Sequence, residues 1–163
     1  MRRPQIYTIR HDFPGQLSTM AKPAGGPQLP DDLTSLRTCG VDVLVSALTE
    51  GEQIELTLLN EPDVAKVAGL EFHSVPIGDF GVPDRDTVRP TLELLLAKLH
   101  DGHHVVTHCW AGIGRSSLLA ASLLVLDGRP PDEAWALISE ARGLTVPETD
   151  HQRRWVGGFA RST

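Results

Sequence analysis

Residues 108–116 combine the side chains and the spacing of a phosphate-binding site. They contain a nucleophile, Cys109, and a planar guanidinium, Arg115, which can bind two phosphate oxygens at once. Five residues separate these two, so the chain must curl once around the ligand before the guanidinium returns to it. Gly112 and Gly114 permit the positive φ values and the close backbone approach that such a curl requires. The sequence therefore predicts a loop that binds a dianion beside a thiol.

The predicted loop lies between a strand and a helix. Residues 104–108 form a short apolar run typical of a buried strand, and residues 116–127 are almost wholly apolar and end before Gly128, as a buried helix would. In this position the loop amides can converge on one point, where the helix N-terminus adds partial positive charge. These donors should favour the thiolate of Cys109. We expect the phosphate to contact Trp110, Ala111, Gly112, Ile113, Gly114 and Arg115.

Two side chains at the ends of this loop are expected to support it. Ser116 can donate a hydroxyl hydrogen bond to the sulfur when the sulfur leaves, and His108 can order the loop by hydrogen-bonding its backbone. The neighbouring His104 also raises the question of a metal site. Two histidines four residues apart on a strand are separated by about 13 Å, which is too far for joint ligation of one ion. We therefore expect no metal.

Strands and helices alternate along the rest of the chain. The sequence predicts an opening hairpin or two edge strands at 5–9 and 16–20, and buried strands at 41–48, 70–77 and 104–108. Predicted helices begin near Asp31, Ser116, Pro131 and Pro147. Two brief helical pieces broken at Pro62 are expected before Gly69, and a further helix is expected to have Pro90 in its first turn.

This alternation predicts one three-layer α/β domain over residues 1–163, with a central, mainly parallel sheet flanked by helices. In such folds the ligand site lies beyond the carboxyl ends of the strands. Asp79 and Cys109 both follow predicted strand ends. We therefore expect the two side chains to share one site.

Composition excludes several other classes of protein. With 40% hydrophobic and 22% charged residues, the chain resembles a soluble globular protein rather than a disordered one. No apolar run is long enough for a membrane span or a signal peptide, and a net charge of −6 argues against a nucleic-acid partner. Two cysteines are too few for a disulfide scaffold or a zinc cluster. We expect a cytoplasmic monomer.

Residues 108–116 resemble the H-C-x5-R-S/T signature of cysteine-dependent protein tyrosine and dual-specificity phosphatases. Residues 75–79 (Val-Pro-Ile-Gly-Asp) are similar to the strand and acid loop of compact members such as the kinase-associated phosphatase (cyclin-dependent kinase inhibitor 3) group. The resemblance covers roughly residues 31–160. It implies that Cys109 attacks phosphorus, that Arg115 binds the phosphoryl oxygens, and that Asp79 protonates the leaving oxygen. It implies no cofactor.

The resemblance leaves two residue assignments to be decided. Residues 82–84 (Val-Pro-Asp) look like the Trp-Pro-Asp loop of larger tyrosine-specific enzymes, which makes Asp84 a rival acid. Asp79 is preferred because it follows the Pro-Ile strand end directly, whereas Asp84 suits the cap of the next helix. Gln152 resembles the glutamine that positions water for the second step, and members of the family vary in using it.

Three functions remain open. The first is a phosphatase of phosphotyrosine or phosphoserine/threonine proteins. The second is a phosphatase of inositol lipids or other small phosphates; lipid-specific relatives commonly place lysines within the loop, whereas Trp110, Ala111 and Ile113 are uncharged. The third is a non-catalytic phosphate-binding module, which would be expected to lose the cysteine or the acid.

Other conspicuous side chains have ordinary structural interpretations. Cys39 is expected to be a small buried residue of its helix rather than a redox partner of Cys109. Trp110 could line the rim of the site or pack against helices. Three arginines are expected to be solvated surface charges and two tryptophans to be core residues: Arg85, Arg89, Arg153, Trp135 and Trp155.

Overall fold

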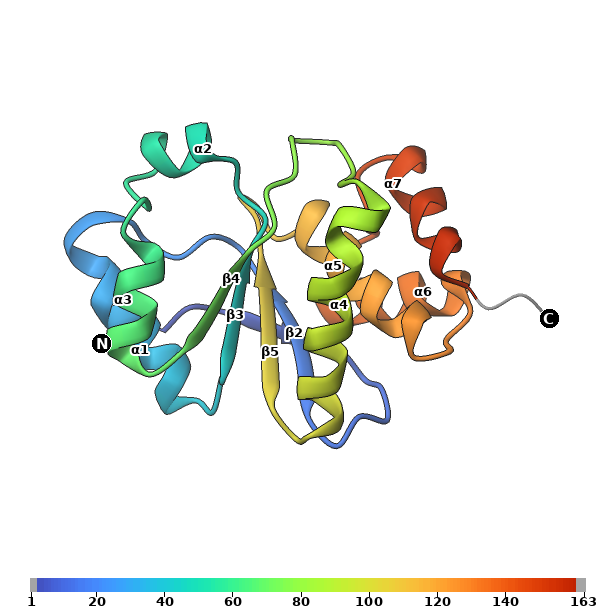
Figure 1. The fold of residues 1–163 in the computed structure, drawn as a ribbon, viewed down its shortest axis with the longest axis horizontal. Helices are drawn as coiled ribbons and strands as arrows, with labels where there is room; N and C mark the ends of the chain where they lie inside the picture. The colour runs from blue at the N-terminus through green and yellow to red at the C-terminus, as the bar shows by residue number, and fades with distance from the viewer. Residues whose placement is uncertain (1–2, 161–163) are drawn as a thin grey trace.

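The centre of the fold is a five-stranded sheet, seen in a computed structural model that describes residues 3–160 (Figure 1). The strands are β1 (Ile6–Thr8), β2 (Gln16–Met20), β3 (Val43–Ser46), β4 (Glu71–Ser74) and β5 (His104–His108). Their order in the sheet is β1-β2-β5-β3-β4. β1 pairs antiparallel with β2, and the remaining pairs are parallel. The predicted α/β fold with a mainly parallel sheet is confirmed.

Helices cover both faces of the sheet (Figure 1). They are α1 (Leu29–Thr38), α2 (Glu50–Glu55), α3 (Glu61–Ala68), α4 (Arg85–His100), α5 (Arg115–Leu126), α6 (Pro131–Arg142) and α7 (Asp150–Trp155), with short 3-10 turns at Gly26–Gln28 and Val156–Phe159. α1 and α3 pack together on one face, while α4, α5 and α6 lie on the other. In the described part of the chain, no helix has the length and apolarity to cross a membrane.

Neighbouring residues of the central strands contribute to two different cores. Leu44 and Val106 belong to the cluster beneath α1 and α3, whereas Val45 and Val105 belong to the cluster beneath α4 and α5. This follows from the alternation of side chains along a strand. Because both faces are covered, the central strands are continuous apolar runs, as their sequences predicted.

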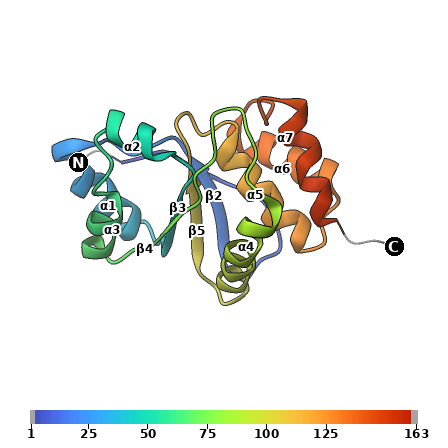
Figure 2. The ribbon, with the colours of Figure 1, turned by 45° about the horizontal axis from the view of Figure 1, so that its top comes forward.

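The carboxyl ends of the parallel strands meet at one edge of the sheet. Ser46 at the end of β3 pairs with His108 at the end of β5. Beyond β4 the chain stays attached to this edge, since the amide of Ile77 donates to the carbonyl of Ala47 at 3.0 Å. Residues 78–84 then pass over this edge before α4 begins. They lie close to α7, at the same end of the strands as α2 (Figure 2).

Two expected helix boundaries were wrong. Pro62 does not break a helix but lies in the first turn of α3, where its missing N–H costs nothing. Asp84 caps α4, as the sequence suggested, so the helix begins at Arg85 and Pro90 lies inside it rather than in its first turn. β1 and β2 form the predicted opening hairpin, and because β2 also pairs with β5, β1 and not β2 lies at the edge of the sheet.

Candidate active site

The loop between β5 and α5 encloses Cys109. The thiol is only 3% exposed, and its Sγ lies 3.4 Å from Ser116 Oγ. The base of the loop is closed by Thr107, whose hydroxyl donates to the carbonyl of Ser116 at 2.9 Å. The strand that delivers the nucleophile and the helix that follows it are thereby held together.

Gly112 allows this loop to lie directly against the end of β2. Its φ is +73°, and a Cβ atom at this position would come within 2.9 Å of the backbone of Met20 and Ala21. The amide of Lys22 adds a hydrogen bond to the carbonyl of Trp110 at 3.1 Å. A residue with a side chain would therefore be excluded both by the dihedral angle and by fixed backbone atoms.

Arg142, at the end of α6, holds two carbonyls of the loop. Its Nε donates to Gly112 O at 3.1 Å and its Nη2 donates to Ala111 O at 3.4 Å. The guanidinium also lies over the ring of Tyr7, 4.3 Å from the centroid. These contacts occupy carbonyls of the loop, so that its amide groups remain for an anion. Sequence reasoning missed Arg142, which looked like an ordinary cation in the last turn of a helix.

Arg115 is buried and bound by a carboxylate from another element. Its Nη1 and Nη2 donate to the two oxygens of Glu52, at 2.6 and 2.9 Å, and Nη1 also donates to Ile77 O at 2.8 Å. Burial disfavours the guanidinium charge, but the bonds to Glu52 outweigh it and raise the pKa of Arg115. The same bonds lower the pKa of Glu52. Because Glu52 binds the edge formed by the two Nη atoms, the edge formed by Nε and Nη2 is the one that can donate to a bound anion.

Glu52 is a site residue that sequence reasoning missed. It belongs to a capping box with Thr49, in which the amide of Glu52 donates to Thr49 Oγ1 at 3.3 Å and the amide of Thr49 donates to Glu52 Oε1 at 3.0 Å. The signal was present, since a Thr-x-x-Glu pattern directly after a predicted strand marks a helix start at the carboxyl edge of the sheet.

His108 links the loop to α3. Its Nδ1 lies 3.2 Å from Cys109 O and its Nε2 lies 2.6 Å from Glu61 Oε2. The side chains of His108 and Glu61 are 0% and 1% exposed. Both ring nitrogens are therefore engaged, which fixes the orientation of the buried ring. No sequence signal pointed to Glu61 beyond its place at the start of a helix.

The structure brings Asp79, and not Asp84, to the cysteine. Asp79 lines the same cavity as Cys109, and its Oδ1 lies 3.6 Å from Arg115 Nη2. Asp84 is engaged elsewhere, because its Oδ2 accepts hydrogen bonds from the hydroxyl and the amide of Thr87, at 2.7 and 3.0 Å. These two bonds lower the pKa of Asp84.

The cavity at this edge has a volume of about 300 Å³. Its lining residues are Asp79, Cys109, Trp110, Ala111, Arg115 and Glu148. Trp110 is 38% exposed, so it forms part of the rim rather than packing between helices. Glu148 was not expected from the sequence, where it was interpreted as a helix start. Burial, reinforced by the negative charge of Asp79, raises the pKa of Glu148, while Arg115 opposes this shift.

Gln152 connects α7 to the loop that carries Asp79. It is fully buried, and its Nε2 donates to Gly81 O at 3.2 Å. Its Oε1 is buried without a hydrogen-bond partner among the described residues. A Cβ atom at Gly114 would lie 3.3 Å from Gln152 Nε2, so the amide is adjacent to the phosphate loop.

Two structural interpretations need correction. Cys39 is exposed and follows the last residue of α1, so it was wrongly expected to be buried. The three arginines are not simply solvated, because each lies over an aromatic ring. The distances to the ring centroids are 5.0 Å for Arg85 over Trp155, 5.0 Å for Arg89 over Phe159 and 5.8 Å for Arg153 over Trp135. Trp135 and Trp155 are buried, as predicted.

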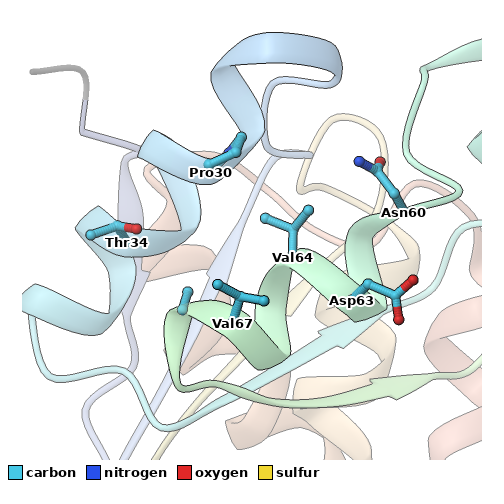
Figure 3. A pocket seen from close by; sticks show the side chains of 7 residues that line it. Pro30, Thr34, Asn60, Asp63, Val64 and Val67 are labelled. Carbon is cyan, nitrogen blue, oxygen red and sulfur yellow. The ribbon is translucent and has the colours of Figure 1, made fainter.

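A second cavity of about 290 Å³ lies between α1 and α3 (Figure 3). Its lining residues are Pro30, Thr34, Asn60, Asp63, Val64, Val67 and Ala68. Asp63 is the one ionisable group among these described residues, and it has no nucleophile beside it. The chemistry of the molecule is therefore concentrated at the loop of Cys109.

Comparison with known proteins agrees with this geometry. The family model described as "Polymorphic toxin system, DSP-PTPase phosphatase" matches residues 18–129. Human cyclin-dependent kinase inhibitor 3 is 30% identical over 130 residues, which are 78% of this chain and 61% of that protein. The chain thus spans less than two thirds of the length of that relative. Protein tyrosine phosphatase PRL-1 of Leishmania major is 32% identical over 142 residues, 82% of this chain and 75% of that protein.

Solved structures share the fold. Kinase associated phosphatase with its catalytic-site cysteine replaced by serine matches with a TM-score of 0.87 and 25% identity, covering 98% of this chain and 95% of that one. PTPMT1 matches with a TM-score of 0.75 and 22% identity, covering 94% and 93%. With its Cys-x5-Arg loop at the carboxyl edge of this sheet, the chain belongs to the superfamily of cysteine-dependent dual-specificity and protein tyrosine phosphatases.

Proposed function

We propose that this phosphatase hydrolyses phosphomonoesters through a phosphocysteine intermediate, and that its substrates are phosphoproteins. One observation carries the mechanism: a nucleophile, a buried guanidinium and a carboxylic acid, Cys109, Arg115 and Asp79, line a single cavity of about 300 Å³. No metal is needed, because the amides of the loop and Arg115 supply the positive electrostatic potential for the phosphoryl oxygens.

In the first step the Cys109 thiolate attacks phosphorus and the bond from phosphorus to the ester oxygen breaks. Asp79 gives its proton to that oxygen, so the alcohol or phenol leaves neutral. The Nε and Nη2 edge of Arg115 and the loop amides bind the three equatorial oxygens throughout. Glu52 orients the guanidinium by accepting hydrogen bonds from its two Nη atoms.

In the second step water attacks the phosphocysteine. Asp79 takes a proton from the water, the bond from sulfur to phosphorus breaks, and inorganic phosphate is released. Ser116, whose Oγ lies 3.4 Å from the sulfur, donates a hydrogen bond to the departing thiolate. Gln152 positions the water through its buried acceptor.

The names of the sequence relatives support phosphoprotein substrates, since one is a kinase inhibitor and another a protein tyrosine phosphatase. Inositol lipids are the second candidate, because one structural neighbour is PTPMT1 in complex with PI(5)P. We infer a reducing, cytoplasmic compartment, since the thiolate must stay unoxidised. Residues 1–163 would act there as one monomeric catalytic domain.

Hydrolysis of p-nitrophenyl phosphate tests the phosphatase activity. We expect turnover by the unmodified protein without added metal and in the presence of a chelator, and none by Cys109→Ser. Rapid quenching of the reaction should trap phosphate on the protein. Turnover that persists in Cys109→Ser, or that needs a metal, would refute the mechanism.

A further inference from the structure

The proposed reaction does not use Glu148, although this carboxylate stands in the phosphate cavity. Glu148 lies between α6 and α7, and it lines the cavity together with Asp79, Cys109 and Arg115. Its Oε1 is so close to Gly114 that a Cβ atom added there would collide with it. The carboxylate of Glu148 therefore lies against the loop that binds the substrate phosphate.

The cavity offers little positive charge to balance this carboxylate. Among the described residues that line it, Arg115 is the only cation, and Glu52 already binds two of its nitrogens. Asp79 adds a further carboxylate, and its repulsion, added to burial, raises the pKa of Glu148. The exposed residue beside Asp79, Phe80, is uncharged.

Other arginines near this edge are engaged with backbone carbonyls, and Arg142 donates to those of Ala111 and Gly112 in the phosphate loop itself. The Nη2 of Arg85 donates to Trp155 O at 2.7 Å, and the Nη2 of Arg153 donates to Val146 O at 3.2 Å. Lys22 lines a separate cavity. The phosphate that reacts is bound by the loop amides and Arg115. A second anionic group next to it would instead lie close to the carboxylate of Glu148.

We propose that Glu148 determines specificity: it selects phosphopeptides with a basic residue beside the phosphorylated side chain and rejects substrates that carry a second phosphate, such as polyphosphorylated inositol lipids. This inference rests on the proposed phosphatase function. For unit charges about 6 Å apart in an aqueous to intermediate dielectric, Coulomb's law gives roughly a three- to tenfold change in binding. The net charge of −6 acts in the same direction at longer range.

The test compares kcat/KM for two phosphotyrosine peptides of equal length, one flanked by arginines and one by glutamates, with p-nitrophenyl phosphate as reference. We expect the unmodified enzyme to prefer the basic peptide. Glu148→Gln should reduce this preference roughly three- to tenfold, and Glu148→Lys should reduce it further or reverse it. The matched control is Glu133→Gln, which removes the same charge from an exposed site on α6 that pairs with Arg129 at 3.5 Å. It should leave the preference unchanged.

Three outcomes would overturn this role of Glu148. These are an unchanged preference in Glu148→Gln, an equal loss of turnover on all three substrates, and faster hydrolysis of a soluble inositol bisphosphate lipid than of the basic peptide. If p-nitrophenyl phosphate is not hydrolysed at all, the proposed function fails instead. Even then, the role of Glu148 can be tested by binding. The dissociation constants of the two peptides are measured for Cys109→Ser and for the double variant Cys109→Ser/Glu148→Gln, and their ratio shows whether Glu148 discriminates between the peptides.

Discussion

Glu61 and His108 form a fully buried pair directly beneath the nucleophile, with Glu61 Oε2 2.6 Å from His108 Nε2. The other ring nitrogen of His108 lies 3.2 Å from the carbonyl of Cys109. One chain of contacts thus runs from the first turn of α3 to the phosphate loop. Folding of the α1 and α3 side of the sheet is thereby coupled to the geometry of the site.

Removal of Glu61 should therefore destabilise the protein strongly. Glu61→Ala leaves Nε2 of the buried His108 ring without its hydrogen-bond partner, and a buried polar group left unpaired typically costs about 1–3 kcal/mol, or more where it is charged. Urea unfolding should show this loss, while Asp63→Ala, which removes an exposed carboxylate from the same helix, should change stability by less than about 1 kcal/mol. Equal effects of the two substitutions would show that the pair contributes nothing special.

Glu52→Gln should weaken catalysis by releasing Arg115. The guanidinium would lose a bidentate charged partner, and a displacement of the phosphate by about 1 Å can cost on the order of 10²-fold in rate. We expect kcat/KM for p-nitrophenyl phosphate to fall by about this factor. Unchanged kinetics would mean that Ile77 and the loop hold Arg115 without Glu52.

The same substitution should change the dependence of stability on pH. The pKa of Glu52 is lowered in the folded protein, so its contribution is fully present above the ordinary value of 4.5 and is lost as the pH falls through the folded value. Unfolding free energies measured between about pH 5 and pH 3 should therefore fall less steeply in Glu52→Gln than in the unmodified protein. A steeper fall in the variant would contradict the assignment.

Asp79 and Asp84 can be distinguished by the same conservative change. Asp79→Asn should lower kcat/KM by about 10² to 10⁴ because the general acid is lost. The loss should shrink for esters of acidic phenols, which need no proton to leave. Asp84→Asn is a matched control, since asparagine caps a helix as well as aspartate does. A large loss in Asp84→Asn alone would reverse the assignment.

The sequence predicted those parts of the site that are local in the chain. The Cys109 loop follows β5 and starts α5, so one continuous segment determines its shape, and Asp79 lies in the segment that follows β4. The partners that stabilise this loop come from elsewhere: Glu52, Glu61 and Arg142 reach it only through the packing of α2, α3 and α6. The sequence context of Glu61 and Arg142 is that of ordinary helix ends. The Thr-x-x-Glu pattern marks Glu52 as part of a helix start, but its contact with Arg115 is visible only in the tertiary structure.

The phosphate loop lies directly against the end of β2 at Gly112. Gly112 has a φ of +73°, and a Cβ atom there would come within 2.9 Å of backbone atoms of Met20 and Ala21, which cannot move independently of the strand. Gly112→Ala should therefore lower kcat/KM by at least about 10²-fold, since the loop must shift by more than the tolerance of the reaction geometry. Inorganic phosphate should also bind more weakly, as measured by calorimetry.

Gly40→Ala separates this steric effect from the strain of the dihedral angle alone. Gly40 has a φ of +94°, but a Cβ atom there meets nothing within 4 Å. The cost should be about 1–2 kcal/mol of stability, without an effect on phosphate binding or turnover. If Gly112→Ala behaves in the same way as Gly40→Ala, the loop does not depend on its contact with β2, and the reaction tolerates a displacement of the loop.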